Sequence, residues 1–137
     1  MTHLGLNSAA AALEKGFQTL CFDSDKALIE KLRGGNWPVV EPNLPEIFQK
    51  NRAKVSFSPE VSDIQRCDLV YIAADVPTDE CGTSDLSAIR ALIDLVVPNL
   101  QPHAILVVLC QVPPGFTRSL SFPKERLCLS CNPHAPL

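Results

Sequence analysis

The chain begins Met1-Thr-His-Leu-Gly5, which matches the last five positions of a Gly-x-Gly-x-x-Gly dinucleotide loop. The alanine-rich residues 4–15 predict a helix that starts at this glycine, and residues 17–22 predict a strand with Asp23 at its end. A glycine lets a helix N-terminus approach a pyrophosphate, and an acid after the second strand accepts hydrogen bonds from a ribose. These residues therefore predict part of a mononucleotide-binding unit.

The loop departs from the full motif. Thr2 stands at the position of the second glycine, where its side chain would crowd a phosphate, and the sequence lacks the first glycine and the strand before it. An ordinary alanine-rich helix that leads into a strand is the alternative interpretation of these residues.

Composition narrows the class of protein. The chain has 137 residues, of which 46% are hydrophobic and 20% charged, enough for one core. Its net charge of -3 argues against nucleic acid or an anionic membrane as the main partner. The longest apolar run, residues 104–110, is too short to span a bilayer, and the N-terminus has no secretory signal pattern. We therefore expect a cytoplasmic protein with reduced cysteines.

Apolar runs alternate with amphipathic segments along the rest of the chain. Residues 68–74 and 104–110 are almost entirely apolar, as in parallel strands that are covered on both faces. Between them, Ser84 or Asp85 is the expected cap of a helix with apolar residues at helical spacing. Further elements are expected at residues 25–32 and 44–50 (helices) and 55–57 (a strand).

This succession predicts an α/β fold, a partial Rossmann-type doubly wound parallel sheet that lacks its first strand. Its parallel strands are expected at residues 19–22, 69–73 and 105–109, with helices on both faces. We expect one domain over residues 1–120 and a short C-terminal tail over residues 121–137, in which residues 126–130 favour a further strand.

Longer motifs follow one another in a distinctive order. They are Asp23-Ser-Asp25, then Val40-Glu-Pro-Asn-Leu-Pro-Glu46, then Cys67-Asp-Leu-Val-Tyr-Ile-Ala-Ala-Asp-Val-Pro77 with Gly82 and Ser84-Asp85-Leu86, then Val107-Val-Leu-Cys-Gln-Val-Pro-Pro-Gly-Phe-Thr-Arg118. In order and spacing they resemble the NAD-binding domain of the UDP-glucose/GDP-mannose dehydrogenase family. The resemblance covers residues 3–120.

The resemblance implies NAD as cofactor and a set of residues around it. Gly5 would lie near the pyrophosphate and Asp23 on the adenosine ribose. Val76 and Pro77 would follow the fourth strand, and Val112 and Pro113 would follow the fifth, near the nicotinamide. Ligands of doubly wound sheets bind outside the carboxyl ends of strands, which agrees with these positions. The alternative for the two proline turns is plain chain reversal after a buried strand.

The resemblance also implies an activity. Such enzymes oxidise the C6 alcohol of a nucleotide sugar to a carboxylate in two NAD-dependent steps, through a thioester on a cysteine. In the family, that cysteine and the sugar pocket lie on a central helix and a second domain, which are absent from these 137 residues. We expect the NAD-binding part of a nucleotide-sugar 6-dehydrogenase, cut at both ends. It would have no catalytic residue of its own, would be inactive alone, and would meet a nucleotide sugar only when a second domain completes the site.

Several departures from the family pattern leave a second interpretation open. Leu28 replaces the usual lysine, with Lys26 close by; Gln111 replaces a threonine; and His134 stands where an acid would follow Asn132. The alternative is a non-catalytic scaffold or interaction module derived from that domain, within a homo- or hetero-oligomer.

No metal site is expected. Cys128 and Cys131 have the spacing of a metal or redox pair, but no second Cys-x-x-Cys accompanies them. The acidic group of Asp79, Glu80 and Asp85 is explained by a solvated loop with a capping aspartate.

Overall fold

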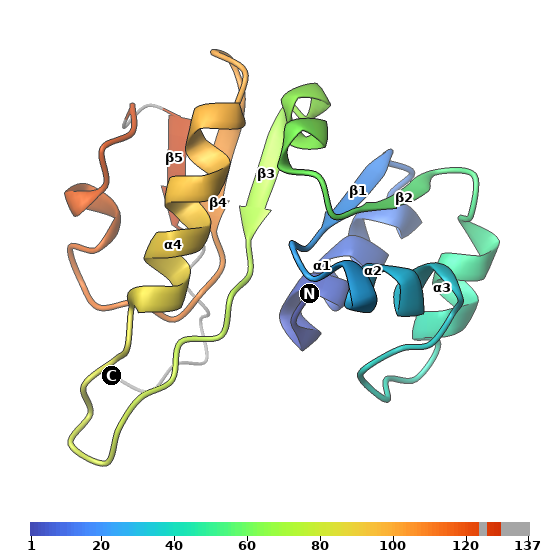
Figure 1. Ribbon diagram of the computed structural model, residues 1–137, viewed down its shortest axis with the longest axis horizontal. Coiled ribbons are helices and arrows are strands. Elements are labelled where there is room, and N and C mark those ends of the chain that lie inside the picture. Colours follow the sequence, from blue (N-terminus) through green and yellow to red (C-terminus); the bar gives the residue numbers. More distant parts are fainter. Residues whose placement is uncertain (124–125, 130–137) are drawn as a thin grey trace. The chain divides into compact units, whose positions relative to one another are not determined.

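A computed structural model describes residues 1–123 and 126–129 of the chain. The chain divides into two compact units, Met1–Ile64 and Gln65–Leu137. In Figure 1 the first unit runs from blue to green and the second from green to red.

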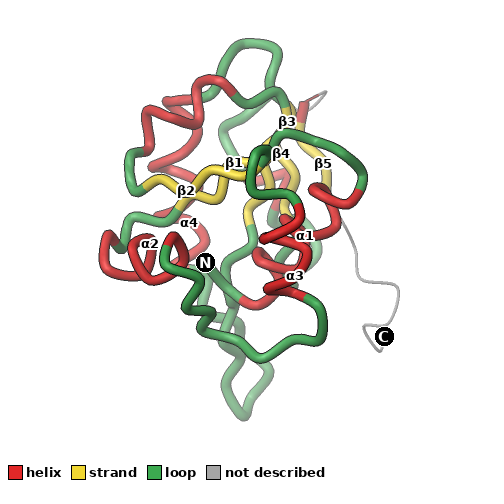
Figure 2. Tube along the Cα trace, turned by 90° about the vertical axis from the view of Figure 1, so that its right-hand side faces the viewer, coloured by secondary structure: helices red, strands yellow, loops and turns green. Residues whose placement is uncertain are grey.

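The first unit contains a two-stranded parallel sheet and three helices. Along the chain it has α1 (His3–Glu14), β1 (Thr19–Phe22), α2 (Lys26–Arg33), α3 (Leu44–Lys50), β2 (Val55–Ser58) and the start of the 3-10 helix η1 (Val61–Arg66). β1 pairs with β2 in register from Thr19 opposite Val55 to Phe22 opposite Ser58. α1 and α3 lie side by side (Figure 2). There Lys50 forms an ion pair with Glu14, with Nζ and Oε1 3.2 Å apart.

The alanine run contributes small side chains to the buried face of helix α1. Its buried side chains are Leu6, Ala9, Ala10 and Leu13, which recur at helical spacing and form one face. Small side chains on this face let the helix lie close to its neighbours. Gly16 ends the helical segment with a positive φ of 91°, a conformation that glycine adopts at no steric cost.

Aromatic side chains complete the core of the first unit. The Trp37 ring lies 4.6 Å from that of Phe48 and 6.3 Å from that of Phe57, centroid to centroid. These contacts pack the loop that carries Trp37 against the core. Contacts between aromatic rings stabilise a fold beyond the effect of burying their surface area.

The second unit is built on a three-stranded parallel sheet. Its order along the chain is β3 (Leu69–Ile72), α4 (Ser87–Val96), the 3-10 helix η2 (Val97–Asn99), β4 (Ile105–Val108), the 3-10 helix η3 (Thr117–Ser119) and β5 (Leu127–Leu129). In the sheet the strands lie in the order β3-β4-β5. Leu69 pairs with Ile105, and Leu106 pairs with Leu127. β5 lies in the tail, residues 121–137, in which the sequence favours a further strand.

The α/β prediction is confirmed: both sheets are parallel, and helices separate their strands. β1 has the predicted bounds, whereas β3 and β4 each end one residue earlier than predicted. In particular, the strands around Leu69 and Ile105 pair in parallel, as a doubly wound sheet requires.

The expected start of α4 is wrong. Leu86, not Ser84 or Asp85, is the N-cap residue, and it makes no side-chain capping bond. The reason lies in the preceding loop, because Ser84 pairs with Thr78 and the Asp85 N–H donates to the Pro77 carbonyl (2.8 Å). The pKa of the Asp85 carboxyl is nevertheless lowered, first by a hydrogen bond from the Ser87 side chain and then by one from the Ser87 N–H at 2.9 Å.

Within residues 1–123 and 126–129, no helix is long and apolar enough to cross a membrane.

Candidate functional site

The N-terminus of α1 is closed by a side chain. Thr2 is the N-cap residue, and its hydroxyl oxygen accepts the Gly5 N–H at 3.2 Å. Gly5 is half-buried in the first turn of the helix. The threonine at the position of the second loop glycine therefore occupies one of the N–H groups that a helix N-terminus would offer to an anion.

Asp23 lies where the sequence predicts it, directly after β1. Its N–H donates to the Ser58 carbonyl (3.3 Å), which ties it to the end of β2. One carboxylate oxygen accepts the Asp25 N–H at 2.9 Å, and the other forms an ion pair with the amino group of Met1. The pair with Met1 brings the start of α1 and the carboxyl end of β1 together, so Gly5 and Asp23 belong to the same end of the first unit.

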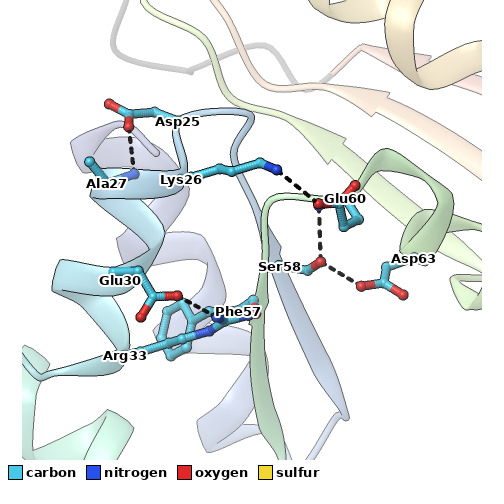
Figure 3. A network of polar contacts seen from close by, with 9 residues as sticks. All are labelled: Asp25, Lys26, Ala27, Glu30, Arg33, Phe57, Ser58, Glu60 and Asp63. Carbon is cyan, nitrogen blue, oxygen red and sulfur yellow. Dashed lines mark hydrogen bonds and ion pairs between the residues drawn. The ribbon is translucent and has the colours of Figure 1, made fainter.

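Around Asp23, a polar network links the start of α2 to the end of β2 (Figure 3). Lys26 Nζ lies 3.5 Å from Glu60 Oε1. The Glu60 N–H donates to the Ser58 hydroxyl oxygen (3.1 Å), and that hydroxyl donates to Asp63. Ser58 is 5% exposed, so the network has a buried anchor. Sequence reasoning missed Ser58, Glu60 and Asp63, although a polar residue at the end of a predicted strand was a signal.

A second contact that the sequence did not predict ties a loop to α1. His3 pairs with Glu41 through Nε2, and the same nitrogen lies 3.1 Å from the Asn7 side-chain nitrogen. Glu41 opens the Glu-Pro-x-Leu-x-Glu motif, which leads into α3. The motif thus anchors the loop before α3 to the first turns of α1.

In the second unit, Val76 and Pro77 follow β3 and open a loop of residues 77–85. Asp79 organises this loop, since one of its oxygens accepts the N–H groups of Cys81 (2.9 Å) and Thr83 (2.8 Å). Figure 1 shows this loop as a long connection between β3 and α4. The Asp79 and Asp85 carboxylates are thus engaged by backbone N–H groups. Within the described ranges, no cluster of three metal-capable side chains occurs.

Val112 and Pro113 follow β4 and enter a tight turn. The Pro113 carbonyl accepts the Phe116 N–H at 3.1 Å, and Gly115 has a positive φ of 90°. Beside them, the Cys110 thiol donates to the Ile72 carbonyl and accepts the Ala74 N–H. Both proline turns therefore follow the carboxyl ends of neighbouring parallel strands, at the same end of the sheet β3-β4-β5. Burial raises the pKa of the Cys110 thiol, which favours its neutral form.

The site residues thus fall into two groups. Gly5 and Asp23 share one end of the first unit, and Val76, Pro77, Val112 and Pro113 share one edge of the second. The substituted positions differ in burial: Leu28 packs partly against the core of the first unit, whereas Gln111 is exposed. Cys131, Asn132 and His134 lie outside the described residues, as does the side chain of Cys128.

Residues 1–126 match the family described as UDP-glucose/GDP-mannose dehydrogenase family, NAD binding domain. The chain belongs to this family. The family and its cofactor, NAD, are those that the ordered motifs predicted.

Curated relatives agree with this assignment. UDP-glucose 6-dehydrogenase TuaD of Bacillus subtilis is 29% identical over 116 residues, which are 82% of this chain and 25% of that protein. UDP-glucose 6-dehydrogenase of Pseudomonas aeruginosa is 31% identical over 116 residues, 82% of this chain and 26% of that protein. The chain thus spans about a quarter of the length of these relatives.

Solved structures share the fold. The UDP-N-acetyl-mannosamine dehydrogenase Cap5O of Staphylococcus aureus superposes with a TM-score of 0.81 at 20% identity, over 93% of this chain and 34% of that one. The NDP-N-acetyl-D-galactosaminuronic acid dehydrogenase of Methanosarcina mazei Go1 gives a TM-score of 0.78 at 25% identity, over 94% of this chain and 32% of that one. These structures therefore share the α/β architecture of this chain.

Proposed function

We propose that the chain binds NAD for a nucleotide-sugar 6-dehydrogenase, with the adenosine ribose on Asp23 and the pyrophosphate at the α1 N-terminus. The observation that carries the proposal is the match of residues 1–126 to the family's NAD-binding domain, together with an acid at the carboxyl end of β1. When bound, NAD would supply the hydride acceptor. The role of this chain is to bind and orient it.

Asp23 fits a ribose. Its carboxylate is half-buried and fixed by the Asp25 N–H, and its second oxygen already accepts a donor from the Met1 amino group. A ribose hydroxyl is a neutral donor that the carboxylate can also accept, and the resulting charge-assisted hydrogen bond stabilises binding. Gly5 has no side chain to obstruct an approaching pyrophosphate.

Thr2 fits less well. Its hydroxyl oxygen takes the Gly5 N–H, and its side chain stands where the motif's second glycine lets the backbone approach a phosphate. We therefore propose weak affinity for NAD. The same observation favours the second candidate function, a non-catalytic scaffold or interaction module that retains the fold without the cofactor.

Titration of the purified chain with NADH, followed by fluorescence, separates the two candidates. Asp23→Ala should weaken binding by about 1 to 3 kcal/mol, the range of a lost hydrogen bond to a charged group. Glu46→Gln is the matched control: it removes an exposed carboxylate in the first turn of α3 and should leave the affinity unchanged. No NADH binding by the folded wild type, or tight binding that Asp23→Ala leaves unchanged, would contradict the proposal.

The activity and partners of the whole enzyme belong to the same proposal. Because the chain spans about a quarter of its curated relatives, a nucleotide sugar is a proposed substrate only where a further domain completes the site. We also propose that the chain assembles into an oligomer, homomeric or heteromeric. Sedimentation of the purified chain, with and without a full-length family member, tests it.

A cytoplasmic location is also proposed. It is supported by the free thiols of Cys21, Cys81 and Cys110, since cytosolic thiols stay reduced. Fractionation of cells that express the tagged chain tests this location.

A further inference from the structure

Glu60 lies close to Asp23 through a shared neighbour, Ser58. The Asp23 N–H donates to the Ser58 carbonyl, and the Glu60 N–H donates to the Ser58 hydroxyl oxygen. Since Ser58 is almost fully buried and its hydroxyl also donates to Asp63, the backbone at Glu60 is tied to the end of β2. A ligand held by Asp23 would therefore meet the Glu60 side chain as a neighbour.

Two groups beside Asp23 have the chemistry to bind a phosphate on the adenosine ribose. The first is the N-terminus of α2, since helix N-termini bind phosphate through their N–H groups. Here Asp25 has already taken two of these groups, because one of its oxygens accepts from Ala27 N (2.9 Å) and Leu28 N (3.1 Å). This helix end thus presents a carboxylate to an incoming anion.

The second group is the ammonium of Lys26, the first residue of α2. A cation near the ribose is what accommodates the 2′-phosphate in NADP sites. Glu60 neutralises this cation, with 3.5 Å between Nζ and Oε1 (Figure 3). Both side chains are mostly exposed, 76% for Lys26 and 62% for Glu60, so the pair contributes little to stability.

The guanidinium of Arg33 is engaged as well. It pairs with Glu30 at 2.6 Å and donates to the Phe57 carbonyl at 2.7 Å (Figure 3). The Arg33 guanidinium is therefore already hydrogen-bonded to groups of α2 and β2, so it is not available for bidentate hydrogen bonds to a phosphate.

The charges at this end of the first unit add up to a negative field. Asp23, Asp25 and Glu60 carry three carboxylates, whereas Lys26 and the Met1 amino group supply two ammonium groups. A phosphate monoester carries a charge of about -1.5 to -2 at neutral pH, so it is repelled where a ribose hydroxyl is accepted.

We propose that Glu60, by pairing with Lys26, is a specificity-determining residue that makes the ribose end of this site favour NAD over NADP. The inference rests on the proposed function, which places the adenosine ribose on Asp23. It assigns to Glu60 a role in cofactor choice that is separate from hydrogen bonding to the ribose.

The test is titration of the full 137-residue chain with NADH and with NADPH at low ionic strength. Glu60→Gln keeps the backbone bond to Ser58 and frees Lys26. We expect it to tighten NADPH binding by about two- to fivefold, as for the change of one exposed charge, and to leave NADH binding almost unchanged. The gain should shrink at high salt, where exposed charges are screened.

Two further variants separate the pair from simple charge removal. Glu46→Gln removes one exposed carboxylate of the same unit and should leave the NADH/NADPH ratio unchanged. Lys26→Gln combined with Glu60→Gln should lose most of the gain, because the freed ammonium is gone. Thermal melts check that each variant stays folded.

The outcomes distinguish the two proposals. If wild-type protein binds NADH and Glu60→Gln leaves the ratio unchanged, the inference is overturned and the proposed function stands. A wild type that prefers NADPH also overturns the inference alone. If folded wild type binds neither cofactor, the proposed function fails and the inference fails with it.

Discussion

The thiol of Cys110 donates a hydrogen bond to the carbonyl oxygen of Ile72, with sulfur and oxygen 3.3 Å apart. The same sulfur accepts the Ala74 N–H at 3.2 Å, so one side chain fastens the end of β4 to the end of β3. The two proline turns leave the sheet just beyond this point. The geometry of that edge therefore depends on a cysteine that has a structural role.

Cys110→Ala should destabilise the protein by about 1 to 2 kcal/mol, because it removes buried volume and leaves the Ala74 N–H without the sulfur acceptor. Urea unfolding monitored by circular dichroism measures the change. Cys81→Ala is the control, since Cys81 is exposed and its replacement should stay within about 0.5 kcal/mol. An equal free energy of unfolding for the two variants would contradict a structural role for Cys110.

Stability should fall at alkaline pH through Cys21. Burial raises the pKa of its thiol from 9.0 to about 12, so between these values the folded protein retains a proton that the unfolded chain has lost. Rising pH therefore favours unfolding, and the contribution present below pH 9 is lost by about pH 12, on the order of 4 kcal/mol in total.

The measurement is the free energy of unfolding in urea at several pH values between 8 and 10.5, for wild type and for Cys21→Ala. The difference between the two proteins cancels the other alkaline groups, and it should change steadily with pH. Parallel curves would show that Cys21 is not protected from ionisation in the folded state.

Thr2→Gly should strengthen NADH binding by a few fold. The substitution removes the side chain that occupies the Gly5 N–H, and at an N-cap position glycine costs only a few tenths of a kcal/mol relative to threonine. Thr2→Ser retains the hydroxyl and is the matched control, with no expected gain. A tighter complex for Thr2→Ser than for Thr2→Gly would show that the hydroxyl assists binding.

The chain alone should produce no NADH from UDP-glucose, UDP-N-acetyl sugars or GDP-mannose. Holding a sugar in line with the nicotinamide supplies roughly 7 to 11 kcal/mol where it is fully realised, and the proposed sugar pocket needs a further domain. Absorbance at 340 nm measures the product. Turnover above background that disappears when a residue of this chain is mutated would contradict the prediction.

The regular elements were predictable because they depend on local pattern. The apolar run that ends at Phe22 and the helix that begins at Leu44 have the bounds that periodicity and turn residues indicate. The start of α4 was not predictable, because Ser84 and Asp85 are equally good caps in isolation. The contacts of Ser84 and Asp85 with residues 77 and 78 determine where α4 starts, and the local sequence pattern does not encode these contacts.

The candidate site was predictable only in part. Asp23 was placed by its distance from Gly5, a spacing that the fold itself imposes. The contacts of Lys26 with Glu60 and of His3 with Glu41 join residues more than thirty positions apart. Such pairs depend on how the elements pack, so charge alone gave no reason to choose these partners among the exposed acids.

The loop that Asp79 organises carries an exposed cysteine that can be labelled. Its two backbone bonds hold the exposed Cys81 within a fixed turn, while the thiols of Cys21 and Cys110 are buried. Once Cys67, Cys128 and Cys131 are replaced, a fluorophore or spin label on Cys81 would report from a defined position. Such a reporter would reveal whether cofactor arrival reorients the loop after Pro77, without any need for turnover.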